Sequence, residues 1–127
     1  MLRYLYRMTY FAIALGGALG SVLRYLIQSA LRPATGGFPW GTLAVNLAGS
    51  FLIGLCAALA ERQGAGSWIR PWLMIGLLGG FTTFSAFSLE NVHLLRGGHI
   101  ALLFLYVLVS VMGGLALALA GYALARS

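Results

Sequence analysis

The sequence contains no lysine and no aspartate, and its acidic residues are Glu61 and Glu90. Charged residues occupy only 8% of the 127 positions, whereas hydrophobic residues occupy 61%. The mean hydropathy of +0.92 lies far outside the range of soluble globular domains. This composition excludes a soluble protein and predicts a single-domain integral membrane protein.

Cysteine is nearly absent, because Cys56 is the only one and lies within an apolar run. A single cysteine forms neither an intramolecular disulfide nor a cysteine metal cluster, so Cys56 is expected to pack as a small hydrophobic residue. The net charge of +6 comes from eight arginines. Arginines at the ends of apolar segments first orient a membrane protein, so no nucleic-acid partner is expected.

Four apolar stretches follow one another along the chain. They cover approximately residues 9–31, 40–60, 69–95 and 99–125. Each can form a helix that crosses a hydrocarbon core of about 30 Å, which needs about 20 residues. The connections between them are short and rich in glycine and proline, which leaves no room for a soluble catalytic domain. The sequence therefore predicts an all-α protein with four transmembrane helices and no enzyme activity.

The first stretch is expected to remain in the membrane rather than to be a cleaved signal peptide, because its apolar run continues past Arg24 to Leu31. With four spans, both termini lie on one side of the membrane. That side would carry Arg3, Arg7, Arg62, Arg70 and Arg126, and the other side Arg32 and Arg96, with Arg24 if it reaches the far interface. This bias favours cytoplasmic termini without fixing one orientation.

Residues 79–88 in the third stretch, G-G-F-T-T-F-S-A-F-S, are unsuited to an uninterrupted helix facing lipid. Gly79 and Gly80 together cost about 1.5 to 2 kcal/mol of helix propensity relative to alanine. Thr82 and Thr83 offer the backbone alternative hydrogen-bond partners. A break at membrane depth persists only where it is buried in protein or lines a wet cavity. The third helix is therefore predicted to be broken near its middle and sheltered.

Uncharged polar groups recur inside the other spans. Asn46 must face protein or water, either as a structural link between helices or as a ligand. Tyr106 and Ser110 lie four residues apart, on a face that either packs or presents hydroxyl donors. Arg24 either extends to the interface or concentrates anions at a pore mouth. Gly16 and Gly20 are expected to let another helix approach closely.

No span centre carries a carboxylate, and this absence separates the possible functions. A small proton-coupled multidrug exporter needs an acid within the membrane, and cation channels use acidic rings or ordered carbonyls. Hydroxyls, an amide and the positive ring edges of Phe81, Phe84 and Phe87 suit a small anion instead, although such a stripe also fits core packing. The exporter and a non-transporting assembly subunit remain the alternatives.

Three stretches resemble the signatures of the small bacterial fluoride channels of the Fluc, or CrcB, family. They are G-G-A-L-G-S-V-L-R-Y (residues 16–25), G-T-L-A-V-N-L-A-G-S-F-L-I-G (41–54) and G-L-L-G-G-F-T-T-F-S-A-F-S-L-E (76–90). The resemblance extends over all four spans in order. It implies a passive channel that exports fluoride across the bacterial inner membrane. It also implies an antiparallel homodimer, inserted in both orientations, with two pores and a structural sodium ion at its centre.

The resemblance further implies roles for individual residues. Asn46 would be the pore-lining amide, and the ring edges of Phe84 and Phe87 would line the fluoride path. The other implied positions are Thr83, Ser85, Tyr106 and Ser110 along the pore, Arg24 at its vestibule, and the backbone carbonyls of Gly79 and Thr82 around sodium. The sequence departs from the family pattern in its less balanced arginine count and in Phe81, where an aliphatic residue is expected.

Overall fold

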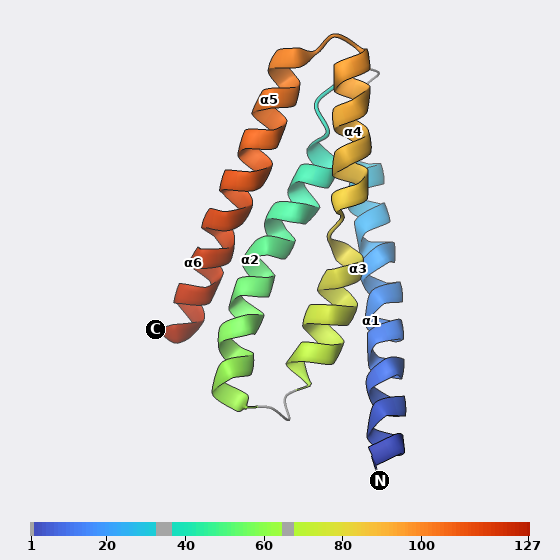
Figure 1. Cartoon of the computed structure of the whole chain (residues 1–127), viewed down its shortest axis with the longest axis vertical. Coiled ribbons are helices and arrows are strands. Elements are labelled where there is room, and N and C mark those ends of the chain that lie inside the picture. Colours follow the sequence, from blue (N-terminus) through green and yellow to red (C-terminus); the bar gives the residue numbers. More distant parts are fainter. Residues whose placement is uncertain (1, 33–36, 65–67) are drawn as a thin grey trace.

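The computed structural model describes residues 2–32, 37–64 and 68–127, and describes side chains from Arg7 onward. These ranges are helical apart from short connections (Figure 1). The elements are α1 (Leu2–Ala30), α2 (Trp40–Gln63), η1 (Ile69–Leu78), α3 (Gly79–Phe81), α4 (Phe84–Arg96), α5 (Ile100–Leu108), η2 (Val109–Gly113) and α6 (Gly114–Arg126). The segments η1 and η2 are π-helical, with wider turns than an α-helix.

Within the described ranges, four helical segments are long and apolar enough to cross a membrane: Arg7–Ala30, Trp40–Gln63, Ile69–Arg96 and Ile100–Arg126. The third consists of η1, α3 and α4 in series, and the fourth of α5, η2 and α6. The predicted fold class, an all-α membrane protein with four spans and an interrupted third helix, is confirmed.

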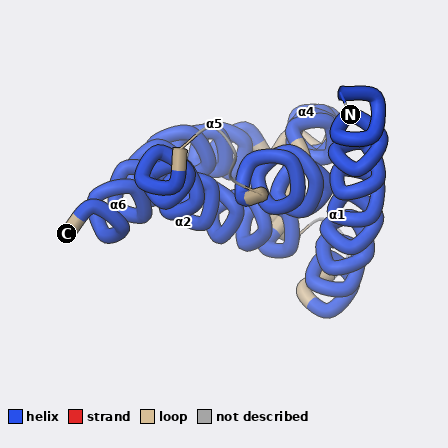
Figure 2. Tube along the Cα trace, turned by 90° about the horizontal axis from the view of Figure 1, so that it is seen from below, coloured by secondary structure: helices blue, strands red, loops and turns tan. Residues whose placement is uncertain are grey.

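The spans pack in pairs through glycines that let two backbones meet. α1 lies against η1 and α3, and α2 lies against α6 (Figures 1 and 2). A Cβ atom at Gly16 would lie 2.7 Å from the Trp72 carbonyl oxygen, and one at Gly20 would overlap the Leu77 carbonyl oxygen. A Cβ atom at Gly121 would likewise overlap the α2 backbone. Close approach is the role expected of Gly16 and Gly20.

The two ends of the chain lie on the same side of the molecule (Figure 1). Polar contacts fasten the last turns of α2 and α6 to each other there. The Tyr122 hydroxyl donates to Glu61 Oε2 at 2.7 Å, and Arg62 Nη1 donates to the Ala125 carbonyl oxygen at 3.0 Å. Glu61 is therefore a structural group at a span end, away from the span centres.

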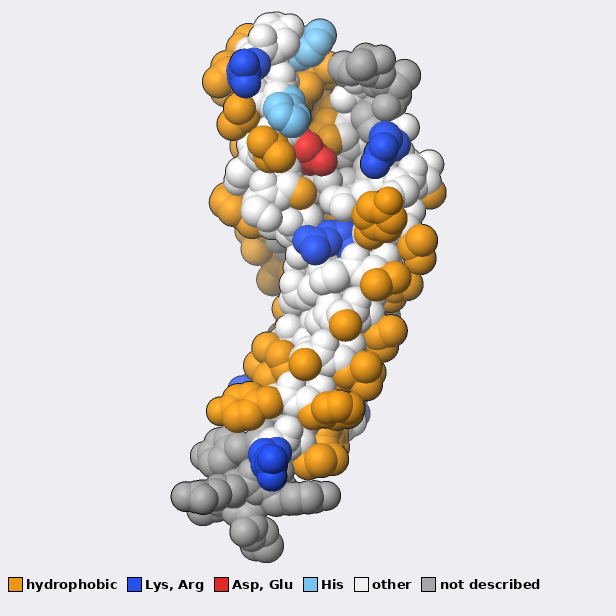
Figure 3. All heavy atoms as spheres, turned by 90° about the vertical axis from the view of Figure 1, so that its right-hand side faces the viewer, with side chains coloured by type: hydrophobic (Ala, Val, Ile, Leu, Met, Phe, Trp, Pro, Cys, Tyr) orange, Lys and Arg blue, Asp and Glu red, His pale blue; other side chains and the backbone are white. Residues whose placement is uncertain are grey.

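The interior is small, and much of the apolar surface faces outward. Its buried clusters are Val45, Cys56, Leu78 and Phe81, and Leu43, Leu94 and Tyr106. Cys56 is buried within the first cluster, as expected of a small hydrophobic residue. Large apolar side chains remain exposed on every span, and Figure 3 shows them along one face, below a hollowed end that carries charged residues. In a membrane, lipid or another protein covers such a surface.

Candidate functional site

The third span unwinds at two residues near its middle. Thr82 (φ −82°, ψ 156°) and Thr83 (φ −152°, ψ 121°) are extended, and α4 begins at Phe84. The prediction that the glycines take part in this break is wrong, because Gly79 keeps helical angles of −63° and −37° and α3 includes Gly80. Gly80 instead packs closely, since a Cβ atom there would overlap the Gly17 carbonyl oxygen.

Asn46 of α2 binds the backbone of the break with both ends of its amide. Its Nδ2 donates to the Thr83 carbonyl oxygen at 2.9 Å, and the Thr83 N–H donates to its Oδ1 at 2.8 Å. The amide thus binds both the N–H and the carbonyl of Thr83, as the backbone of a neighbouring β-strand would. This is the structural role considered for Asn46. Because an amide nitrogen carries two hydrogens, one donor remains beyond this pair.

Two of the carbonyls at the break can be identified from the N–H groups that no longer bind them. In a continuous α-helix, the N–H of Thr83 would bond to the Gly79 carbonyl and that of Ala86 to the Thr82 carbonyl. Here Thr83 donates to Asn46, and Ala86 donates to Thr83 Oγ1 at 3.2 Å as the N-terminal cap of α4. The two carbonyls are those that the resemblance assigns to sodium.

A polar hollow of about 260 Å³ lies beside the break. It is lined by Asn46, Gly49, Ser50, Ile53, Thr82, Thr83 and Phe84. Ser85 is exposed next to it, with its hydroxyl 3.2 Å from Thr83 Oγ1. No lining residue is acidic or basic. The structure therefore brings Asn46, Thr83, Phe84 and Ser85 together around a neutral set of hydrogen-bonding groups.

An aromatic row leads from this hollow toward the end where α4 and α5 meet. The ring centroids of Phe84 and Phe87 are 5.6 Å apart, and those of Phe87 and Tyr106 are 5.0 Å apart. Phe84 is 78% exposed, whereas Tyr106 is fully buried. Phe81 belongs to the core instead. Of the phenylalanine stripe, two rings therefore adjoin the site and one packs in the interior.

Two other predicted residues do not line the hollow at the break. The Ser110 hydroxyl, within η2, is buried and has no hydrogen-bond partner in the described part of the chain. Arg24 is half-buried on α1 and lines neither this hollow nor the larger cavity described below. The single chain therefore does not gather all the predicted residues into one continuous site.

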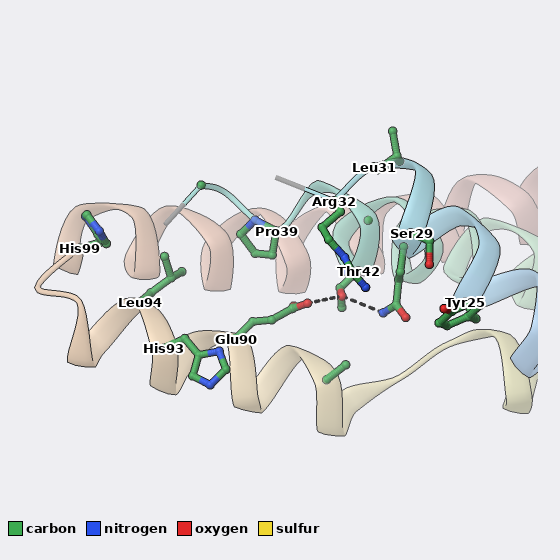
Figure 4. Close-up of a pocket in the computed structure, with 14 residues that line it drawn as sticks. Tyr25, Ser29, Leu31, Arg32, Pro39, Thr42, Glu90, His93, Leu94 and His99 are labelled. Atoms are coloured by element: carbon green, nitrogen blue, oxygen red, sulfur yellow. Dashed lines mark hydrogen bonds between the residues drawn. The ribbon is translucent and has the colours of Figure 1, made fainter. Parts of the chain in front are cut away.

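The structure also shows a polar network that sequence reasoning missed. Thr42 Oγ1 donates to Glu90 Oε1 at 2.5 Å and accepts from Gln28 Nε2 at 2.9 Å (Figure 4). The Tyr106 hydroxyl donates to Glu90 Oε2 at 2.7 Å. The spacing of these residues in the sequence could have revealed the network. Thr42 precedes Asn46 by four residues and Glu90 follows Phe87 by three. Thr42 and Glu90 therefore lie on the helix faces that carry the predicted pore residues Asn46 and Phe87.

Glu90 and Thr42 also border a cavity of about 450 Å³ at the end of the molecule away from the termini. Its walls come from the end of α1, the start of α2, α4 and the residue before α5. Tyr106 connects the two regions, because its hydroxyl binds Glu90 and its ring contacts Phe87. The cavity thus adjoins the aromatic row.

Fold and site together define a small four-span membrane protein with a neutral polar hollow at a broken helix. The chain belongs to the CrcB family: the family described as CrcB-like protein, Camphor Resistance (CrcB), matches residues 11–122. This confirms the resemblance stated from the sequence motifs.

Curated relatives from three bacteria carry the name fluoride-specific ion channel FluC. The protein from Agrobacterium fabrum is 50% identical over 117 residues, which cover 91% of this chain and 94% of that protein. The protein from Paracoccus denitrificans is 48% identical, covering 93% of this chain and 94% of its own. A protein from Thermus thermophilus is also 48% identical, covering 91% of this chain and 93% of its own.

The amide pair at the break predicts the effect of Asn46→Ala. The variant leaves the N–H and carbonyl of Thr83 unpaired at membrane depth, so we expect it to lower stability by about 2 to 4 kcal/mol. The matched control is Asn91→Ala, because among the described residues the Asn91 amide nitrogen donates only to the Phe87 carbonyl of its own helix, at 2.8 Å. Thermal unfolding in detergent measures both, and equal losses would contradict the role given to Asn46.

Proposed function

We propose that the protein is a passive, fluoride-selective channel that lets fluoride leave the cytoplasm. The main support is the neutral set of donors at the broken helix, found in a chain about half identical to named fluoride channels. Asn46, Thr83 and Ser85 supply N–H or O–H groups there, and Phe84 supplies a ring edge. Such groups replace the water around a small anion without adding a fixed charge.

The proposed path begins at the polar hollow and follows the aromatic row. Fluoride exchanges water for hydroxyl, amide and ring-edge contacts, passing Phe84, Phe87 and the ring of Tyr106, whose hydroxyl is held by Glu90, with Ser110 completing the path from the fourth span. Arg24 raises the local anion concentration at the vestibule. No covalent bond forms or breaks, so the protein performs no enzymatic step. Fluoride that enters as neutral HF and dissociates inside leaves by this route.

The position of the hollow supports an antiparallel homodimer. Polar groups and an extended backbone in the middle of a span are tolerated only against protein or water, yet the neighbouring Phe84 ring is 78% exposed in the single chain. A second, antiparallel copy related by a two-fold axis would cover this face and bring the two breaks together. Each copy would then contribute residues to the other's ion path.

The proposed structural sodium ion would be held by backbone carbonyl oxygens that meet at this interface. The Gly79 and Thr82 carbonyls have lost the N–H partners they would have in a continuous helix, and unwound backbone carbonyls at membrane depth are typical sodium ligands. Two carbonyls from each subunit would surround the ion. The sodium would neutralise these dipoles and hold the two subunits together.

The channel proposal predicts fluoride efflux without chloride efflux. Liposomes that contain the reconstituted protein, equal potassium fluoride and potassium chloride, and a potassium ionophore to balance the exported charge are diluted into buffer without either anion. Ion-selective electrodes should record rapid loss of fluoride, while chloride loss stays at the rate of protein-free liposomes. Equal release of both ions, or release of neither, would refute the proposed function.

The ring-edge contacts predict that Phe84→Ile and Phe87→Ile slow fluoride efflux by about tenfold or more, because isoleucine has no positive ring edge. The matched control is Phe104→Ile, which changes an exposed phenylalanine of α5 that is outside the aromatic row. The variants should elute from gel filtration like the unmodified protein. If both row variants conduct at the unmodified rate, the rings serve only in packing.

The dimer and sodium proposals are tested by purifying the protein from the outset in potassium buffer without sodium. Light scattering on a gel-filtration column should show a dimer in sodium buffer, with loss of the dimer and of fluoride flux when sodium is absent. A dimer with equal flux in both buffers would remove the sodium site alone. A monomer in both buffers would remove the homodimer as well.

A further inference from the structure

The cavity beside Glu90 concentrates the histidines of this chain. Its wall includes Tyr25, Arg32, Thr42, Glu90, His93 and His99. Both histidines of the sequence are among them. Its volume of about 450 Å³ holds about fifteen water molecules at about 30 Å³ each. It is therefore large enough for a hydrated ion.

The ionisable groups that face this cavity come from different elements. Tyr25 lies on α1 and Arg32 just after it, Glu90 and His93 lie on α4, and His99 precedes α5. α2 contributes Gly41 and Thr42, which carry no charge. With neutral histidines, the formal charges of Arg32 and Glu90 cancel. Protonation of both histidines would change the formal charge of the wall from zero to plus two.

The Glu90 carboxylate is already occupied by other partners. Its oxygens accept from the hydroxyls of Thr42 and Tyr106, and Figure 4 shows the side chain extended toward Thr42 and away from the His93 ring. His93 and His99 are exposed, so their rings contact the solution as well as the cavity. Their charge is thus available to an ion in the cavity.

The geometry points to this cavity as an anion antechamber whose attraction for anions is set by pH through His93 and His99. The inference rests on the proposed function, because the antechamber adjoins the path through Tyr106 and Phe87. Histidine is the residue type that ordinarily gains its charge between pH 8 and pH 5. Acidification therefore makes the wall positive and raises the local fluoride concentration. The channel would conduct best in acid surroundings, where HF carries most fluoride into the cell.

The experiment records fluoride current through the reconstituted protein in a planar bilayer, with the same pH on both sides. Current is the appropriate measure because neutral HF crosses lipid without carrying charge. We expect the current at pH 5.5 to exceed that at pH 7.5 by about two- to fivefold, the effect of two partly screened charges near the ion path. The double variant His93→Gln/His99→Gln should reduce this ratio to about one.

Two further variants make the result specific. Arg96→Gln removes a positive charge from the last turn of α4, outside the cavity wall, and should keep the acid increase. His93→Gln alone, an exposed helix position, should retain part of the increase even if a change at His99 disturbs the turn before α5. An unmodified protein with no acid increase, or a double variant that keeps it, overturns the antechamber. No fluoride current at any pH overturns the proposed function itself.

Discussion

The pairing of the Asn46 amide with the backbone of Thr83 is the interaction on which the rest of the site depends. It replaces the hydrogen bonds that a continuous helix would make, so the third span can unwind inside a membrane without leaving Thr83 unsatisfied. The same pairing frees the Gly79 carbonyl from its helical donor and lets Thr83 cap α4. The structural and ligand roles considered for Asn46 are therefore compatible, since one side chain holds the break and borders the hollow.

Glycines determine which sides of the break are sheltered. A Cβ atom at Gly80 would overlap the Gly17 carbonyl oxygen of α1, and one at Gly49 of α2 would overlap the Thr82 methyl group. α1 and α2 therefore approach the break so closely that a larger residue at either position would displace neighbouring atoms. The Phe84 side stays open, which is why the proposed second subunit belongs there. The close approach of α1 and α2 to the break therefore determines both how the helices pack and which side of the break is open to the proposed ion path.

Sequence reasoning located the spans and the break because both depend on local properties, namely apolar length and poor helix propensity. It also selected Asn46, Thr83, Phe84 and Ser85, which the structure brings together. It assigned the break partly to the glycines, because their low propensity is visible in sequence while their close contacts with other helices are not. The Glu90 network was missed for a similar reason. A carboxylate near a predicted span end looks solvated until Thr42 and Tyr106 are brought to it by the fold.

The distribution of charge along the proposed path is consistent with anion conduction. The polar hollow is neutral, Glu90 is occupied by two hydroxyls, and Arg32 and the two histidines line the cavity near the span ends. In the proposed path, an anion would be attracted at the mouth and would then contact neutral dipoles within the membrane, where a fixed positive charge would bind it too tightly for rapid conduction.

An experimental density map of the protein in a lipid nanodisc with sodium fluoride would test most directly whether the broken third span organises the channel. The expected map shows an extended backbone at Thr82 and Thr83 paired with Asn46. It also shows two antiparallel subunits that meet at their breaks, with cation density between the Gly79 and Thr82 carbonyls. A continuous helix through Thr82 and Thr83, or subunits that meet elsewhere and leave the hollow facing lipid, would contradict it.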